Sequence, residues 1–411
     1  MQNSNLKFVI VGHVDHGKST LIGRLLYDTN SLPLDKIEEI KKTSGDLGRE
    51  TEFAYLVDHL EEERKQGITI DTTQVFFRTD KRGYVIIDAP GHIEFVKNMI
   101  TGASQAEAAI LIIDAKEGIK EQTKRHAYIL SLLGLSQVTV VLNKMDLVDF
   151  REEVFNKIKK DIEEFFVSIN IKPVFYIPVC AISGQNIAKR PLNMAWYKGP
   201  TFLESLDKLK NKESLQNKPL VFPIQDVYKF DDKRIAVGRI EAGVIKRGQV
   251  IKVLPSCQIT KVKSIEKYPG QIDKACAGES IGIVTEDPLF INRGDIIFEP
   301  QNGPIVTDNF KANIFWISRK EFKKDERIII RCSTQETSCK LETIEKRINS
   351  ATLEIIEQDA DILQNLEVGE VVVKTKKPII IKAFNDVPAL GRFVFVQHEN
   401  ICAGGIIANP N

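Results

Sequence analysis

One octapeptide, Gly12-His-Val-Asp-His-Gly-Lys-Ser19, constrains the fold of this chain more than any other feature. It has the form G-x-x-x-x-G-K-S and lies between an apolar run, Lys7–Val11, and a segment with leucines at helical spacing, Leu21, Leu25 and Leu26. Strand, glycine-rich loop and helix in that order predict a loop whose backbone N–H groups close around phosphate oxygens. A simple glycine-rich turn at a strand end is the alternative, and this context argues against it.

Two side chains of this loop have distinct predicted roles. Lys18 is placed to neutralise the β- and γ-phosphate oxygens of a nucleotide, and the hydroxyl of Ser19 is placed to bind Mg²⁺. The nucleotide-binding residues predicted in this stretch are Gly12, His13, Val14, Asp15, His16, Gly17, Lys18, Ser19 and Thr20.

The first half of the chain alternates short apolar runs with helix-length segments such as His92–Ala103 and Glu121–Leu133. Nearly continuous β-branched runs suit parallel strands that are buried on both faces. The alternation therefore predicts an α/β P-loop domain with a doubly wound, mostly parallel sheet. The expected strands are Lys7–Val11, Tyr84–Ile87, Ala109–Ile113, Val138–Leu142 and Val174–Ile177.

The second half has a different pattern, in which short β-rich runs are punctuated by glycine, as in Arg234–Leu254. A polar stretch, Lys210–Lys218, separates the two patterns, and a second break falls at Glu299–Pro304. Regular short strands with turn signals are typical of all-β domains. We expect two all-β barrel domains after the α/β domain, with domain limits at residues 1–210, 218–302 and 305–411.

A second motif, Asp88-Ala-Pro-Gly-His92, follows the predicted strand Tyr84–Ile87. The Asp88 carboxylate is placed to contact Mg²⁺ through water, and Gly91 leaves its amide free to approach the γ-phosphate. His92 is the predicted catalytic residue, which orients the attacking water; a surface histidine at a helix start is the alternative. The nucleotide contacts predicted here are Asp88, Ala89, Pro90 and Gly91.

A third motif, Asn143-Lys-Met-Asp146, ends another predicted strand and predicts guanine binding. The Asp146 carboxylate can accept hydrogen bonds from guanine N1–H and the exocyclic amine, a pattern that adenine does not offer. Asn143 can reach guanine N7, and the aliphatic stem of Lys144 can cover the base. The motif alone is weak, but its order behind the other two makes it strong. The predicted guanine-side contacts are Asn143, Lys144, Met145 and Asp146.

The stretch Gly67–Ile70 lies between the first two motifs and is the predicted switch segment. Thr69 is placed to give a second hydroxyl to Mg²⁺ when the γ-phosphate is present. Ile68, with Val14, is predicted to form a hydrophobic gate before His92. An edge strand is the alternative for this stretch.

Composition bears on partners and location. Net charge is +1, from 57 basic and 56 acidic residues, so no global basic field attracts nucleic acid, and we expect nucleic acid to be an unlikely partner. The six cysteines form no C-x-x-C pair, which disfavours zinc and fits a reducing cytoplasm. The most apolar run, Ala108–Ile113, is too short to span a bilayer, so no membrane association is expected.

The ordered motifs resemble the translation-factor class of GTPases. Arg234–Leu254 is similar to the barrel signature after the GTPase domain of that class, and Gly391–Phe393 and Gly404–Ile407 resemble the end of its third domain. The resemblance implies binding of GTP with Mg²⁺ and hydrolysis of GTP. It also matches Cys180-Ala-Ile182 to a guanine-contacting Ser-Ala-Leu stretch, in which the Ala181 N–H meets guanine O6. A thiol in place of the hydroxyl is a weaker hydrogen-bond partner.

Within that class, several stretches resemble the large GTPase subunit of bacterial sulfate adenylyltransferase (ATP sulfurylase). This resemblance implies a heterodimer or higher assembly with a smaller catalytic subunit that makes adenosine 5′-phosphosulfate and pyrophosphate from ATP and sulfate, driven by GTP hydrolysis here. The alternative is an elongation- or release-factor-like GTPase that delivers a ligand to the ribosome. The stretches are Gly67–Asp71, Gln122–His126, Asn193–Thr201, Cys332–Ile344 and Lys346–Thr352.

Overall fold

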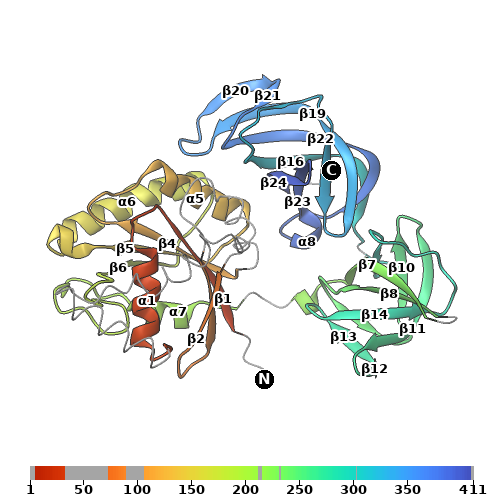
Figure 1. The fold of residues 1–411 in the computed structure, drawn as a ribbon, viewed down its shortest axis with the longest axis horizontal. Helices are drawn as coiled ribbons and strands as arrows, with labels where there is room; N and C mark the ends of the chain where they lie inside the picture. Colours follow the sequence, from red (N-terminus) through yellow and green to blue (C-terminus); the bar gives the residue numbers. More distant parts are fainter. Residues whose placement is uncertain are drawn as a thin grey trace. The chain divides into compact units, whose positions relative to one another are not determined.

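A computed structural model describes residues 5–32, 73–88, 106–211, 215–230, 233–301 and 303–408 of the chain. Two units, Met1–Lys212 and Glu213–Asn411, divide it, and each is described by itself (Figure 1). The helix predicted at His92–Ala103 lies outside the described residues. So do six predicted site residues: Ile68, Thr69, Ala89, Pro90, Gly91 and His92.

The first unit is built on one sheet with the strand order β2-β3-β1-β4-β5-β6. The neighbours β3-β1-β4-β5-β6 are parallel, and β2 pairs antiparallel with β3 at the sheet edge. All seven residues of β4 are buried, and the first six are apolar, as expected of a strand covered on both faces; the seventh is Asp114. The strand bounds are β1 Leu6–Gly12, β2 Thr73–Arg78, β3 Gly83–Asp88, β4 Ala108–Asp114, β5 Val138–Asn143 and β6 Phe175–Pro178.

Helices cover this sheet. Helix α1 (Lys18–Asp28) follows β1 and buries Leu21 and Leu25 in the core below it, as their helical spacing predicts. Helix α5 (Glu121–Leu132), predicted to within one residue, contacts β1 and β4. The remaining elements of the described part of this unit are η2 Met145–Val148, α6 Glu152–Ser168 and α7 Phe202–Lys208.

The first barrel of the second unit closes on itself. Its strands follow the ring β10-β15-β7-β8-β14-β11, and β11 pairs back with β10. Closure removes the free strand edges that an open sheet would present. The bounds are η3 Leu215–Asn217, β7 Val221–Phe230, β8 Lys233–Arg239, β9 Val244–Lys246, β10 Val250–Leu254, β11 Gln258–Lys267, β12 Gly270–Ile272, β13 Lys274–Cys276, β14 Ser280–Thr285 and β15 Ile296–Phe298.

The second barrel closes in the same way, through the ring β18-β23-β24-β16-β22-β19 and the pairing of β19 with β18. Its core includes the fully buried Ile314, Leu341 and Phe395. The apolar run Val371–Val373 marks only the middle of the much longer β22. The bounds are β16 Ile305–Trp316, β17 Phe322–Lys323, β18 Ile328–Cys332, β19 Gln335–Asn349, β20 Ile355–Ala360, β21 Ile362–Leu363, β22 Glu367–Ile381, α8 Pro388–Gly391, β23 Arg392–Gln397 and β24 Asn400–Ile407.

The predicted fold class, an α/β P-loop domain followed by two β-barrels, is therefore confirmed. A cluster of buried side chains from both barrels, including Val221, Phe298, Ile380 and Leu390, joins them within the second unit. No helix in the described part of the chain is long and apolar enough to cross a membrane.

Candidate functional site

The sequence-predicted site residues that the structure describes gather at the carboxyl edge of the parallel strands. Strand β1 ends at Gly12, β3 at Asp88 and β5 at Asn143, and Cys180 follows β6 by two residues. Ligands of open α/β sheets bind outside this edge, where the loops after adjacent strands meet.

The phosphate-binding loop has the backbone that its glycines allow. Asp15 and Gly17 adopt left-handed conformations, with φ of 66° and 87°. Such residues turn successive N–H groups into an anion-binding concavity. A Cβ atom added to Gly12 would collide with Ile112 of β4, and one added to Gly17 would collide with the Asn143 amide. Both glycines are therefore required by close approach, and Gly17 also by its backbone angle.

Lys18 and Ser19 occupy the first turn of α1, where backbone N–H groups favour anions. The Lys18 ammonium donates hydrogen bonds to the carbonyl oxygens of Gly12 (3.1 Å) and His13 (3.2 Å), so it lies over the loop. The side chain of Val14, predicted to be part of a gate, is 39% exposed.

Two buried histidines, His16 and His126, belong to the same region, since the charge of Lys18 and the two rings of His13 and His16 all act on His126. His16 is fully buried, and its Nδ1 lies 3.3 Å from the Ile112 carbonyl oxygen, which fixes Nδ1 as the donor. Burial lowers the pKa of His16, and burial followed by the charge of Lys18 lowers the pKa of His126 to about 3. Both imidazoles are therefore neutral at pH 7, and they add no positive charge beside the lysine.

The Asn143 side chain connects the loops of the site by hydrogen bonds. It is buried, its Nδ2 donates to the His16 carbonyl oxygen (3.0 Å), and its Oδ1 accepts from the Ala181 N–H (3.0 Å). Three loops that are far apart in the sequence are thus joined by one amide. The Ala181 N–H, predicted to meet guanine O6, is engaged by Asn143, so a bond to the base would share or replace this one.

Asp146, whose carboxylate is predicted to select guanine, accepts a hydrogen bond from Cys180, the residue that stands where the resembling family has serine. The Cys180 thiol donates to Asp146 Oδ1 at 3.0 Å. Burial raises the pKa of the Cys180 thiol, and the Asp146 hydrogen bond raises it further, so the sulfur stays protonated as a donor. Met145, the neighbour of Asp146 in the same motif, is fully buried, and Ile182, two residues after Cys180, is 46% exposed.

Asp114 is a residue of the site that the sequence interpretation missed. It ends β4, lies opposite Asn143 in the β4–β5 register, and its carboxylate contacts the Lys144 ammonium at 2.9 Å. The sequence does contain a signal for this residue, because Asp114 directly follows an apolar run just as Asp88 and Asn143 do.

Asp88 is in place at the end of β3, opposite Ile10 of β1, and is only 9% exposed. A buried carboxylate beside the phosphate-binding loop fits a hard cation such as Mg²⁺. The residues predicted to act with it, Thr69 and His92, lie outside the described residues, so their metal-binding and catalytic roles stay predictions.

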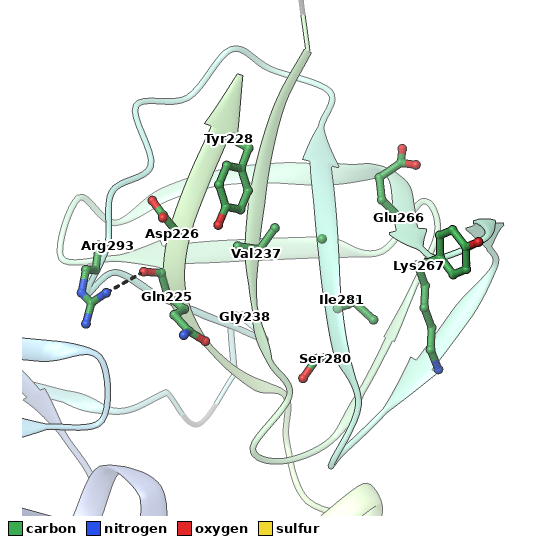
Figure 2. A pocket seen from close by; sticks show the side chains of 12 residues that line it. Gln225, Asp226, Tyr228, Val237, Gly238, Glu266, Lys267, Ser280, Ile281 and Arg293 are labelled. Carbon is green, nitrogen blue, oxygen red and sulfur yellow. Dashed lines mark hydrogen bonds between the residues drawn. The ribbon is translucent and has the colours of Figure 1, made fainter. Parts of the chain in front are cut away.

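The first barrel carries a second candidate site, an open cavity of about 410 Å³ (Figure 2). Tyr228, half exposed, stands over it from β7, next to Asp226. Arg293 donates to the Gln225 carbonyl oxygen at the rim (3.4 Å). The cavity combines two exposed aromatic rings, Tyr228 and Tyr268, with side chains of both charges and backbone at Gly238 and Gly282. It is lined by Gln225, Asp226, Tyr228, Val237, Gly238, Glu266, Lys267, Tyr268, Ser280, Ile281, Gly282 and Arg293.

Comparison with known protein families identifies three domains in order. Residues 3–212 match the family described as Elongation factor Tu GTP binding domain. Residues 233–298 match Elongation factor Tu domain 2, and residues 309–408 match GTP-eEF1A C-terminal domain-like.

Curated relatives match the chain along nearly its whole length. Elongation factor 1-alpha of Thermoplasma acidophilum is 39% identical, covering 98% of this chain and 97% of its own. Elongation factor 1-alpha of Methanopyrus kandleri is 38% identical with the same coverage. That of Saccharolobus solfataricus is 38% identical, covering 99% of this chain and 98% of its own.

These relatives correct two predictions. The assignment to the GTPase subunit of sulfate adenylyltransferase is wrong, and so is its smaller ATP-sulfurylase partner, because the full-length relatives are elongation factors. The expectation that nucleic acid is an unlikely partner is also wrong, for the same reason. A net charge of +1 sums over the whole chain and does not describe how charge is distributed on any one surface.

Proposed function

We propose that this chain, which belongs to the elongation factor Tu family of translation-factor GTPases, is a translation elongation factor that carries aminoacyl-transfer RNA to the ribosome. The observation that carries the proposal is the 39% identity to an elongation factor 1-alpha over 98% of the chain. The similarity spans the GTPase domain and both barrels, so it concerns the function of the whole protein. The domain limits proposed for this arrangement are residues 1–210, 218–302 and 305–411.

Members of this family bind GTP with Mg²⁺. In the proposed site, the loop from Gly12 to Thr20 holds the phosphates, and Asp146 with Asn143 selects guanine. Mg²⁺, bound by Ser19, Thr69 and, through water, Asp88, would supply positive charge to the β- and γ-phosphate oxygens.

The remaining proposed roles concern water and the guanine base. His92 orients the attacking water, with Val14 and Ile68 gating it, so hydrolysis rests on positioning and electrostatics. Cys180, Ala181 and Ile182 complete the guanine side of the pocket.

We further propose that the cavity of the first barrel receives the aminoacylated end of the RNA. The exposed Tyr228 ring offers a face on which a nucleotide base can stack. Arg293 and Lys267 supply positive charge for phosphate, and Gln225 and Asp226 supply polar groups for the aminoacyl end.

The test of the function is protection of the aminoacyl ester. With GTP and Mg²⁺, the protein should slow spontaneous hydrolysis of aminoacyl-transfer RNA, and with GDP it should protect far less. Ribosomes programmed with the matching codon should then accelerate GTP hydrolysis. Protection that is absent with both nucleotides, or hydrolysis that ribosomes leave unchanged, would refute the proposal.

The barrel cavity has its own test. Tyr228→Ala should weaken binding of aminoacyl-transfer RNA by at least about fivefold, since stacking on an aromatic ring contributes on the order of 1–3 kcal/mol per base. The matched control is Phe290→Ala, because Phe290 is an aromatic residue of the same barrel that is 81% exposed and outside the cavity lining. Equal losses in the two variants would remove the cavity from the proposed function.

A further inference from the structure

A buried carboxylate stands at the carboxyl end of β4. The Asp114 side chain is only 3% exposed, and it follows six apolar residues, Ala108–Ile113. Such a group needs hydrogen bonds or an opposite charge to remain ionised. Its Oδ1 accepts from the backbone N–H groups of Lys116 (2.7 Å) and Glu117 (3.2 Å), and its Oδ2 contacts the Lys144 ammonium at 2.9 Å.

The partner of this carboxylate is the lysine of the guanine-binding motif, and its backbone is strained. Lys144 has φ of 60°, in the left-handed region that non-glycine residues seldom occupy. Its side chain is 27% exposed, so the ion pair is partly shielded from water. The β4–β5 register sets Asp114 opposite Asn143, and the Ala115 N–H continues that pairing to the Asn143 carbonyl oxygen at 2.8 Å.

We infer that Asp114 is a positioning residue for guanine recognition, which anchors the ammonium of Lys144 and so fixes the aliphatic stem of that lysine across the loop that carries Asn143 and Asp146. The inference rests on the proposed guanine-binding role of this loop. It adds a residue that lies outside all the motifs on which that role was based.

The physical reason is preorganisation. A lysine that is free in solution loses much rotamer freedom when its stem is fixed against a ligand, and this loss opposes binding. The pair with Asp114 holds the lysine before any nucleotide arrives. Burial raises the pKa of Asp114, but the hydrogen bonds from Lys144, Lys116 and Glu117 lower it below the ordinary value, so the carboxylate remains charged.

The experiment is a double-mutant cycle on guanine nucleotide affinity, with Asp114→Asn, Lys144→Met and the double variant of the full chain. Asparagine keeps an oxygen for the two backbone N–H groups but has no charge for the lysine. Asp114→Asn should raise the Kd for both GTP and GDP about tenfold. Methionine keeps an unbranched stem that needs no counter-ion, so Asp114→Asn should add nothing to the Kd of Lys144→Met.

The matched control is Asp207→Asn, because Asp207 also pairs with a lysine, Lys81, at 2.9 Å in the same unit. It should leave the Kd unchanged. Additive losses in the cycle, or an unchanged Kd in Asp114→Asn, would overturn the inference while wild-type GTP binding stands. A wild-type chain that binds GTP no better than ATP would instead overturn the guanine assignment itself.

Discussion

Replacing Asn143 by alanine should destabilise the first unit as well as abolish guanine binding. The side chain is 2% exposed and makes two hydrogen bonds of 3.0 Å, one to the His16 carbonyl oxygen and one from the Ala181 N–H. Alanine leaves both backbone groups without this partner in a buried place. Each such group costs about 1–3 kcal/mol, so for the two groups we expect a loss of about 2–6 kcal/mol in the free energy of unfolding.

The two tryptophans of the chain make this loss measurable unit by unit. Trp196 belongs to the first unit, where its indole N–H donates to the Phe150 carbonyl oxygen at 2.9 Å. Trp316 belongs to the second unit and is buried in its barrel. In a Trp316→Phe background, urea unfolding followed by fluorescence reports on the first unit. With a slope of about 2 kcal/mol per molar urea, the midpoint should fall by about 1–3 M.

A matched asparagine in the second unit provides the control. Asn365 donates to the Ile317 carbonyl oxygen from an exposed position, so Asn365→Ala should leave the Trp196 transition where it is. A shift of less than about 0.5 kcal/mol in Asn143→Ala would refute the reasoning, because that is the range of surface substitutions without a structural role. Such a result would mean that the loops around Asn143 keep their positions and their stability without the hydrogen bonds of this amide.

Three further predictions follow from the same site. Asp146→Asn should move nucleotide preference from guanosine towards xanthosine triphosphate in competition binding, and undiminished GTP affinity would contradict the guanine assignment. Cys180→Ser should tighten GTP and GDP binding alike, because a hydroxyl is a stronger donor to the Asp146 carboxylate than a thiol, and titration would show an unchanged Kd if the bond is irrelevant. Because folded His126 has a pKa lowered to about 3 while the unfolded side chain takes up a proton near pH 6.5, the first unit should lose stability as the pH falls below about 6.5, by up to about 1.4 kcal/mol per pH unit. Urea midpoints measured between pH 7 and 4 should show this slope, and His126→Asn should reduce it.

The parallel strands and α5 were predictable because their burial leaves a direct mark in the sequence. A strand covered on both faces is nearly all apolar, so β4 and β5 contain the buried runs Ala108–Ile113 and Val138–Leu142, in which Thr139 is the one polar residue. Helix α5 has buried residues at helical spacing, with Thr123, His126 and Leu130 facing inward. In such elements local sequence and tertiary environment demand the same residues.

The long barrel strands and the site contacts were not predictable in this way. β22 extends over Glu367–Ile381, but its alternation of buried and partly exposed residues is interrupted, so only its central apolar part stood out. The pairs Lys144–Asp114 and Cys180–Asp146 join residues 30 and 34 positions apart. Such contacts depend on strand order and register, which local periodicity does not encode.

The wrong functional assignment has a physical cause in the barrel itself. The stretch Cys332–Ile344, which had favoured sulfate activation, forms the end of β18, the turn after it and most of β19. Its distinctive residues Cys332, Cys339 and Leu341 are at most 3% exposed, so they pack the core of the second barrel. The residue at a core position depends on how the side chains of the barrel pack. Barrels that bind different partners can have similarly packed cores. Partners contact exposed side chains, so resemblance in a buried hairpin carries little information about them. Identity along the whole chain samples both buried and exposed positions.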